Sequence, residues 1–439
     1  AYGIWSIVQS IPSMFIVIAH MGTDSLLMRK IAYDKSTEQE SFAKVLLIRL
    51  ILSVCFISFI NIFAYVFNYE SNIKQLILIS AISHSIICFT QVIASVSRAG
   101  ENFILESVLQ ISRSIALLLV VYVVMQFDLK LNGIVYGELI LFIIITATCY
   151  MWYREKYSLK IKLFKFDSYV MYLKSAFPFA LMALIAPIYM QIDIILLSRM
   201  STFESVAIYN VPYKILLFMF AIPLSLRRTL FPSLARMHKT DKDGQIATVR
   251  RACKLITFVG LPASIGLFLI SDRLIYSLFS EQFAESILPL KIMSIMLLFY
   301  YFREIFNVTL YASNMERSVS VLFTITIVIN IILDVILIPR WDYVGACIAT
   351  LLAEISFMAG SYYLIRRGLF KLIEIKDISI IMKFILSVVV MGILVILSRR
   401  LPLPAQVIIG ILGYFISVIV FKVINLEEYQ SVQKLFQYK

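Results

Sequence analysis

Residues 319–338 read VSVLFTITIVINIILDVILI, twenty consecutive residues of which only Asp334 is charged. An α-helix of about 20 apolar residues spans the hydrocarbon core of a bilayer, whereas a membrane β-strand needs only about 9–11. In lipid, a helix satisfies all of its own backbone hydrogen bonds. The length and apolar character of this run therefore predict a membrane-spanning helix.

Similar apolar runs recur along the whole chain and predict thirteen spans in all. The chain is 61% hydrophobic and only 15% charged, against roughly a quarter charged in soluble domains. We therefore predict an all-α polytopic membrane protein, and this composition argues against a soluble enzyme. The predicted spans lie near residues 4–30, 42–67, 74–97, 103–126, 131–153, 171–198, 204–235, 248–271, 286–312, 317–338, 342–365, 377–398 and 402–424.

Lys and Arg gather in alternate connections between the predicted spans. The long basic connections lie near residues 29–44, 154–174, 227–254 and 366–383, and counting along the spans puts all four on one side. The positive-inside rule makes that side cytoplasmic, and with it the C-terminus. Arg399 and Arg400 are the main exception, on the outside. Topology accounts for the net charge of +13, and no motif indicates nucleic acid as a partner.

A weak internal repeat relates the two halves of the chain. The matching residues are Tyr2, Leu27 and Arg29 with Tyr209, Leu234 and Arg236, and Gly133 and Arg154 with Gly345 and Arg366. The repeat predicts two six-helix bundles of the same orientation and a final helix pair. We assign 1–153 to the first bundle, 154–170 to a cytoplasmic linker, 171–366 to the second bundle, and 367–439 to the last two helices and a cytoplasmic tail. The helix at 171–198 has no counterpart before Tyr2, so we expect the first helix of the full fold to be missing.

Several enzymatic chemistries lack their motifs. The chain has no Gly-Lys dipeptide and hence no P-loop for ATP, and its five cysteines form no CxxC pair. The three histidines are scattered, so we predict neither a metal site nor a cofactor. The external connections are short, which disfavours an integral glycosyltransferase or polymerase. The sequence thus favours a transporter over an enzyme.

Charged side chains inside the predicted spans are the candidates for function, because a charge at membrane depth is costly. One interpretation is structural: these groups pair with one another, for instance Glu304 with a basic neighbour on another helix. The other is that the basic residues line a cavity open to the cytoplasm that attracts a phosphate-bearing headgroup. In that case the acids bind the H⁺ or Na⁺ that drives transport. The candidates are Arg49, Arg113, Lys214 and Arg303 for the substrate path, and Glu138, Asp193 and Glu354 for ion coupling.

Three motifs carry a resemblance to a known family. Residues 191–198 (QIDIILLS), 206–214 (VAIYNVPYK) and 230–236 (LFPSLAR) resemble the Wzx-type polysaccharide flippases. These are the O-antigen and exopolysaccharide translocases of the multidrug/oligosaccharidyl-lipid/polysaccharide (MOP) exporter superfamily. The opening residues 2–5 (YGIW) look like the start of that family's second helix, and the resemblance covers essentially the whole chain.

The resemblance implies a MATE-like fold of two bundles around a central cavity. It implies ion-coupled, ATP-independent movement of undecaprenyl-pyrophosphate-linked oligosaccharide from the cytoplasmic to the outer leaflet of the inner membrane. Membrane lipids and polysaccharide assembly proteins are the partners that it suggests. In such proteins a cationic cavity handles the anionic carrier, which suits the four basic candidates. Asp193 matches the acidic position of the family's seventh helix.

Two other members of the superfamily remain as alternatives. One is the lipid II flippase of peptidoglycan synthesis, which the sequence does not exclude. The other is a cation-coupled multidrug exporter, whose pocket we expect to be smaller, more acidic and more aromatic. The basic residues at depth disfavour the exporter.

Overall fold

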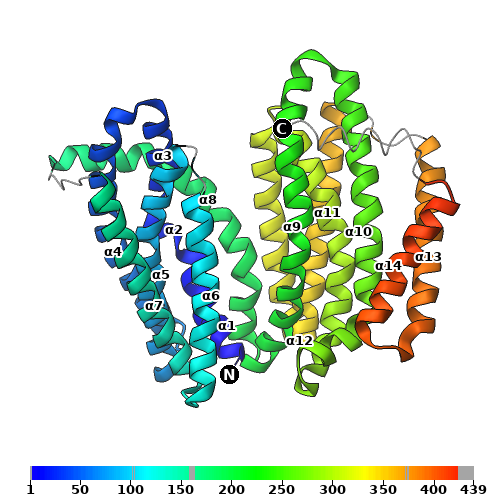
Figure 1. Ribbon diagram of the computed structural model, residues 1–439, viewed down its shortest axis with the longest axis horizontal. Helices are drawn as coiled ribbons and strands as arrows, with labels where there is room; N and C mark the ends of the chain where they lie inside the picture. The colour runs from blue at the N-terminus through cyan, green and yellow to red at the C-terminus, as the bar shows by residue number, and fades with distance from the viewer. Residues whose placement is uncertain are drawn as a thin grey trace. The chain divides into compact units, whose positions relative to one another are not determined.

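The computed structural model describes residues 2–100, 102, 104–157, 164–370, 372 and 375–423, and every regular element in this part is a helix (Figure 1). The chain divides into two compact units, Ala1–Ala207 and Ile208–Lys439. The structure thus confirms the predicted all-α membrane fold. The predicted bundle limits, at residues 153, 171 and 366, stay predictions.

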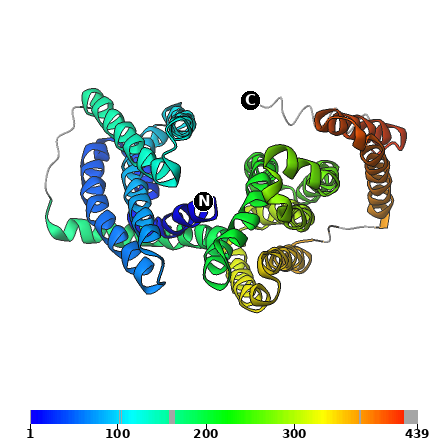
Figure 2. The ribbon, with the colours of Figure 1, turned by 90° about the horizontal axis from the view of Figure 1, so that it is seen from below.

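The helices of the first unit pack around an apolar core. Leu27 of α3, Phe42 of α4, Val92 of α5, Tyr153 of α7 and Tyr172 of α8 are all buried in one cluster. Figure 2 shows α4 and α5 side by side, and α8 contacts α1 and α3. The helices are α1 (Tyr2–Phe15), α2 (Val17–His20), α3 (Thr23–Tyr33), α4 (Glu38–Val66), α5 (Ser71–Ala99), α6 (Ile104–Gln126), α7 (Lys130–Tyr157) and α8 (Phe166–Met200), with a short 3₁₀ turn, η1 (Lys35–Thr37), before α4.

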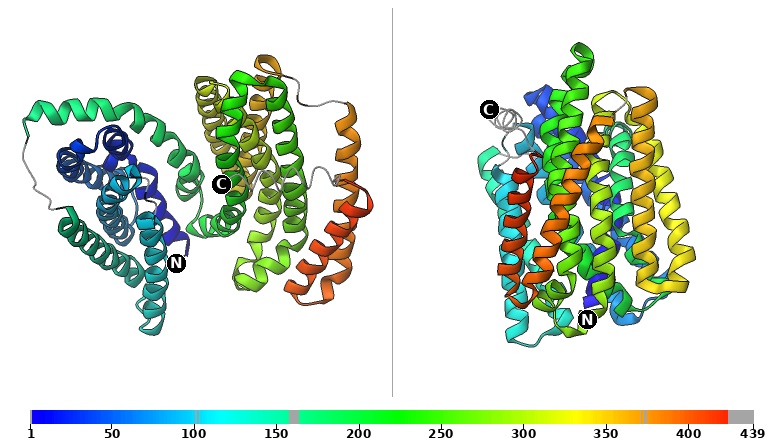
Figure 3. Two further views of the ribbon diagram at one scale, coloured as in Figure 1. Left: turned by 45° about the horizontal axis from the view of Figure 1, so that its top comes forward. Right: turned by 90° about the vertical axis from the view of Figure 1, so that its right-hand side faces the viewer.

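The second unit combines long helices with a C-terminal helical hairpin. Helices α13 and α14 pack against each other and onto α10, through Phe384 and Tyr414 on Phe258 (Figure 3). Its elements are α9 (Phe203–Thr240), which begins just before the unit boundary, α10 (Lys242–Leu278), η2 (Glu281–Ser286), α11 (Ile287–Ala312), α12 (Glu316–Gly368), α13 (Ile375–Leu397), η3 (Ser398–Arg400) and α14 (Leu403–Val420).

Eleven helices of the described residues are long and apolar enough to cross a membrane, by length and composition. One of them, α12, breaks at Asp342, where φ is 51°, and its two arms cover the predicted spans 317–338 and 342–365. The turn is so tight that a Cβ on Gly345 would lie 2.4 Å from the carbonyl oxygen of Leu337. Helix α8 covers the predicted span 171–198. The total of thirteen spans stays a prediction.

Two predicted boundaries differ from the structure. The first predicted span, 4–30, ends at His20, because Met21 and Gly22 adopt positive φ and α3 starts anew at Thr23. The basic connection near 227–254 is helical except at Asp241, so α9 is about 57 Å long, well beyond a hydrocarbon core of roughly 30 Å. The Asp241 side chain accepts a hydrogen bond from the Gly244 amide (2.8 Å) and caps α10. The Leu, Arg, Met, Ala and Lys residues of this connection are strong helix formers, which is why the helices continue.

Two prolines inside α9 each leave a backbone carbonyl without its helical hydrogen bond. A side-chain hydroxyl of a neighbouring element donates to that carbonyl instead. A proline removes the bond to the carbonyl four residues earlier. For Pro212 and Pro223 these carbonyls belong to Ile208 and Met219, which accept from Ser286 Oγ (2.9 Å) and Tyr301 Oη (2.8 Å).

The same device joins α14 to α10. Pro262 frees the carbonyl of Phe258, which accepts from Tyr414 Oη at 2.8 Å. Neighbouring hydroxyls are one of the means by which membrane helices tolerate proline. The kinked helices of the second unit are therefore fixed to their neighbours by hydrogen bonds.

We predict that Tyr301→Phe lowers the free energy of unfolding by about 1–3 kcal/mol, because the partly buried carbonyl of Met219 loses the donor that replaces its helical hydrogen bond. In a Pro223→Ala background the same substitution should cost much less, since the alanine amide restores the bond to Met219. Thermal unfolding in detergent, followed by a thiol-reactive dye that detects buried Cys88, Cys149 and Cys347, measures all four proteins. Equal effects of Tyr301→Phe in both backgrounds would refute this account.

Candidate functional site

Arg49 is fully buried within the first unit, where α3, α4 and α5 meet. Its guanidinium donates to Asp24 Oδ1 (2.6 Å), Thr23 Oγ1 (2.9 Å) and the carbonyl oxygen of Cys88 (3.0 Å). The side chain is 0% exposed, and that of Asp24 is 17% exposed. Arg49 thus forms an ion pair that ties three helices together. Its predicted place on a substrate path stays a prediction.

Arg113 of α6 contrasts with Arg49, because no carboxylate of the described residues lies within ion-pair distance of it. Its guanidinium lies over the ring of Phe142, 4.5 Å from the centroid. The nearest charged influence on it is the attraction of Glu138. The guanidinium N–H groups of this half-buried arginine therefore stay available to hydrogen-bond an anion.

Arg113 lines a cavity of about 400 Å³ inside the first unit. Arg98 and Glu106 form an ion pair at its wall, with 3.3 Å between Nη1 and Oε1. Asp24, the partner of Arg49, also lines this cavity. The other polar lining residues are Thr90, Gln91 and Gln110.

Glu138 is buried on α7 and is held by an amide. Gln9 Nε2 of α1 donates to Glu138 Oε2. One turn along α1, Ser13 Oγ donates to the Gln9 carbonyl (2.6 Å) and lies 3.2 Å from His84 Nε2 of α5. A polar line therefore runs from Glu138 to His84 through α1. Sequence analysis missed Gln9 and His84 as members of this group, because neither stands in a motif and the contacts join distant segments.

The second unit contains a charged network on α9, α11 and the second arm of α12. Arg303 donates to Glu354 Oε1 (2.8 Å) and Glu304 Oε1 (2.9 Å), while Arg227 Nη1 donates to Glu304 Oε2 (3.0 Å). The pairing of Glu304 with a basic residue of another helix, here Arg227 of α9, was expected from the sequence. Two arginines and two glutamates balance each other, and 43% of the Arg227 side chain is exposed.

Lys214 and Asp193 are the two candidates not yet described. Lys214 of α9 is exposed, and no residue of the described chain forms an ion pair with it. Asp193 lies on α8, with 6% of its surface exposed. The structure thus puts Arg49, Arg113, Glu138 and Asp193 in the first unit, and Lys214, Arg303 and Glu354 in the second. It brings Arg303 into contact with Glu354.

The two kinds of basic residue suit different tasks. Arg49 and Arg303 are buried against carboxylates, so they stabilise the fold only as long as those partners stay charged. Among the described residues no carboxylate pairs with Arg113 or Lys214, and a phosphate oxygen would supply an acceptor.

We predict that Asp24→Asn lowers the free energy of unfolding by about 3–5 kcal/mol, because it leaves the buried Arg49 charge uncompensated. Adding Arg49→Met should recover much of this loss. The exposed pair Arg98 and Glu106 is the matched control: Glu106→Gln should cost less than about 1 kcal/mol. Thermal unfolding in detergent measures each variant, and similar losses for Asp24→Asn and Glu106→Gln would show that burial does not decide the effect.

Comparison with known proteins places this geometry in a family. A family model described as "Polysaccharide biosynthesis protein" matches residues 1–288. The probable flippase AglR from Haloferax volcanii is 25% identical over 181 residues, which are 40% of this chain and 37% of AglR. The chain thus matches less than two thirds of that relative's length.

Two solved structures share the fold. The lipid II flippase MurJ, in an inward closed conformation, aligns with a TM-score of 0.77 and 16% identity over 96% of each chain. An inward-facing multidrug resistance MATE family transporter of the MOP superfamily aligns with a TM-score of 0.64 and 15% identity, over 83% of this chain and 91% of that one. Since the family model covers more than half of the sequence, the chain belongs to the polysaccharide biosynthesis protein family, and its multi-pass helical fold is the one that these two membrane proteins share.

Proposed function

We propose that this protein moves an oligosaccharide linked to undecaprenyl pyrophosphate from the cytoplasmic to the outer leaflet of the cell's inner membrane. The supporting observation is that Arg113 lines a polar cavity and that no carboxylate of the described residues forms an ion pair with this arginine. A pyrophosphate carries the charge and the acceptor oxygens that such an arginine lacks. The polar amides and hydroxyl of the same cavity are groups to which sugar hydroxyls can hydrogen-bond.

In this proposal the four basic candidates divide into two roles. Arg113 and Lys214 bind the anionic carrier directly, because their charges are unpaired among the described residues. Arg49 and Arg303, which are held by carboxylates, position the helices that present them. The C-terminus lies in the cytoplasm in this orientation, and assembly proteins of the polysaccharide receive the product outside.

We further propose that the cycle is driven by H⁺ or Na⁺, and that Glu138 is the strongest coupling candidate. Its hydrogen-bond donor is the neutral amide of Gln9, so it can take up a proton without leaving a buried arginine uncompensated. Glu354 is bound to Arg303, and neutralising it would weaken the compensation of that buried charge. Asp193 remains a candidate by its burial and by the family resemblance.

We expect Arg113→Ala and Lys214→Ala each to slow translocation of a labelled polyprenyl-pyrophosphate oligosaccharide in proteoliposomes by at least about tenfold, equivalent to one lost charge-assisted hydrogen bond. Arg340→Ala, an exposed arginine on α12, is the matched control and should leave the rate unchanged.

This assay tests the flippase function and the roles of Arg113 and Lys214 separately. Translocation that survives both substitutions would keep the flippase assignment and reject these two residues. Translocation of lipid II alone would favour the peptidoglycan flippase. No translocation of any lipid-linked glycan, with ion-coupled efflux of small cations, would favour the multidrug exporter.

We expect Glu138→Gln to abolish the response of translocation to an imposed pH or Na⁺ gradient, because the amide side chain neither releases a proton nor carries a negative charge for Na⁺. Glu316→Gln, at the exposed start of α12, should retain the response. The measurement is the initial rate with and without each gradient. A gradient response of normal size in Glu138→Gln would exclude this residue as the coupling site.

A further inference from the structure

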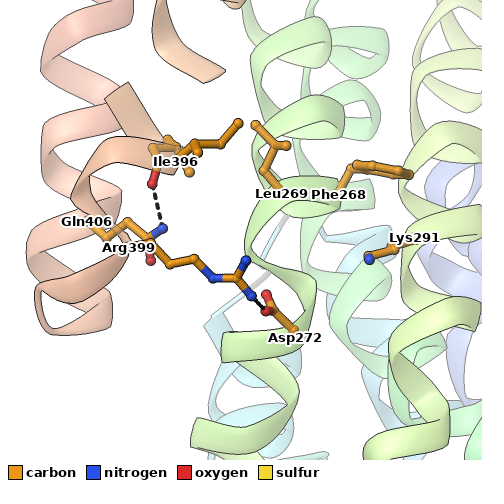
Figure 4. Close-up of a pocket in the computed structure, with 8 residues that line it drawn as sticks. Phe268, Leu269, Asp272, Lys291, Ile396, Arg399 and Gln406 are labelled. Carbon is orange, nitrogen blue, oxygen red and sulfur yellow. Dashed lines mark hydrogen bonds and ion pairs between the residues drawn. The ribbon is translucent and has the colours of Figure 1, made fainter. Parts of the chain in front are cut away.

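A second polar pocket lies where the α13–α14 hairpin meets the end of α10, away from the groups discussed above (Figure 4). Its volume is about 270 Å³. It lies beside the turn that contains Arg399 and Arg400. It is lined by Phe268, Leu269, Asp272, Lys291, Val395, Ile396, Arg399 and Gln406.

Basic side chains dominate this pocket. Arg399 forms an ion pair with Asp272, and 65% of its side chain is exposed. The neighbouring Arg273 is occupied, since its Nη1 donates to the Arg399 carbonyl (2.9 Å) and Gln406 Oε1 (2.7 Å). Lys291 Nζ lies 5.7 Å from the centre of the Phe268 ring, and no carboxylate of the described residues pairs with it. Arg399 and Lys291 are the two cations that line the pocket.

The charges around the pocket leave an excess of positive charge. Among the residues that line the pocket, Lys291 and Arg399 give +2 and Asp272 gives −1, a balance of +1, and Arg273 and Arg400 lie next to lining residues in the sequence without lining it themselves. Glu281 and Glu285 of η2 are the nearby acids in sequence, but they do not line the pocket, and Glu285 accepts from Tyr343 Oη (3.0 Å).

Neither stability nor topology accounts for this excess. An ion pair as exposed as that of Arg399 contributes little to folding. The adjacent Arg399 and Arg400 also oppose the positive-inside rule on the side where we expect the outer leaflet. A negatively charged ligand at the membrane surface would account for both.

The apolar and the charged residues of the pocket are separated as the acyl chain and the headgroup of a lipid are. Phe268 precedes Asp272 by four residues on α10, and Val395 precedes Arg399 by four residues at the end of α13. Both helices thus place an apolar layer about 6 Å, one helical turn, deeper than the charged layer. A headgroup beside Arg399 would leave the first carbons of its chain against Phe268, Leu269, Val395 and Ile396.

We infer that this pocket binds the phosphate headgroup of a membrane lipid. The Arg399 guanidinium and the Lys291 ammonium donate to the phosphate oxygens, and Asp272 is the counter-ion that Arg399 exchanges for the phosphate. The site is distinct from the cationic groups proposed for the transported carrier. Its assignment to the outer leaflet rests on the orientation in the proposed function, but binding itself does not.

The test is native mass spectrometry of the purified full chain in detergent, titrated separately with phosphatidylglycerol, polyprenyl phosphate, phosphatidylcholine and inorganic phosphate. We expect phosphatidylglycerol or polyprenyl phosphate to bind most tightly. Lys291→Gln with Arg399→Gln should weaken that binding at least about tenfold, as expected for lost charge-assisted contacts. Arg399→Lys should retain part of it.

The matched control is Arg340→Gln, which removes an exposed arginine outside the pocket and should leave lipid binding unchanged. Thermal unfolding of the double variant checks that it is folded. Equal binding of phosphatidylglycerol to wild type and double variant would overturn the proposal. Binding of inorganic phosphate as tight as that of either anionic lipid, with the same loss in the variant, would overturn the lipid assignment and indicate a free phosphate site. Because the assay involves no translocation, a negative result here leaves the flippase proposal standing, and the converse also holds.

Discussion

A polar group in the hydrocarbon core of a membrane has no water to hydrogen-bond with. The packing of helices in both units depends on which side chains supply the hydrogen-bond and ion-pair partners instead. In the second unit, hydroxyls of Ser286, Tyr301 and Tyr414 reach the carbonyls that prolines have freed. In the first, Asp24 supplies the charge that Arg49 requires. Each of these bonds joins two helices, so the need for partners also decides which helices pack together. At Arg113, where no carboxylate of the described residues supplies an ion-pair partner, the same need for a partner marks a candidate ligand site.

The two units meet this constraint to different degrees. The second unit balances Arg227 and Arg303 with Glu304 and Glu354, and the network has no net charge. The first unit contains an ion pair, a carboxylate held by an amide, and an arginine held only by an aromatic ring. In the balanced network each charge is compensated by a partner, whereas no carboxylate of the described residues pairs with Arg113.

The sequence predicted the fold better than the site, for a physical reason. Apolar length alone identifies a spanning run such as 319–338, and the break of α12 at Asp342 falls beside the gap between the predicted spans 317–338 and 342–365. Helix ends were less predictable: Gly22 ends the first span early through its backbone conformation, and the connection around Asp241 continues as helix. The site depends on helix rotation, which apolar runs do not encode. Arg49 and Arg113 look alike in sequence, yet only the folded chain reveals that one has a carboxylate and the other a phenyl ring.

The hydroxyl bonds at the prolines also bear on how α9 deforms. In an unbroken helix, bending stretches the bonds between successive turns, and the backbone resists. At Pro212 and Pro223 the corresponding bond has been transferred to a neighbouring side chain, Ser286 or Tyr301. Because Ser286 lies in η2 and Tyr301 in α11, a bend of α9 at either point also displaces or breaks a hydrogen bond to a neighbouring element. The shape of α9 is thereby coupled to the positions of η2 and α11.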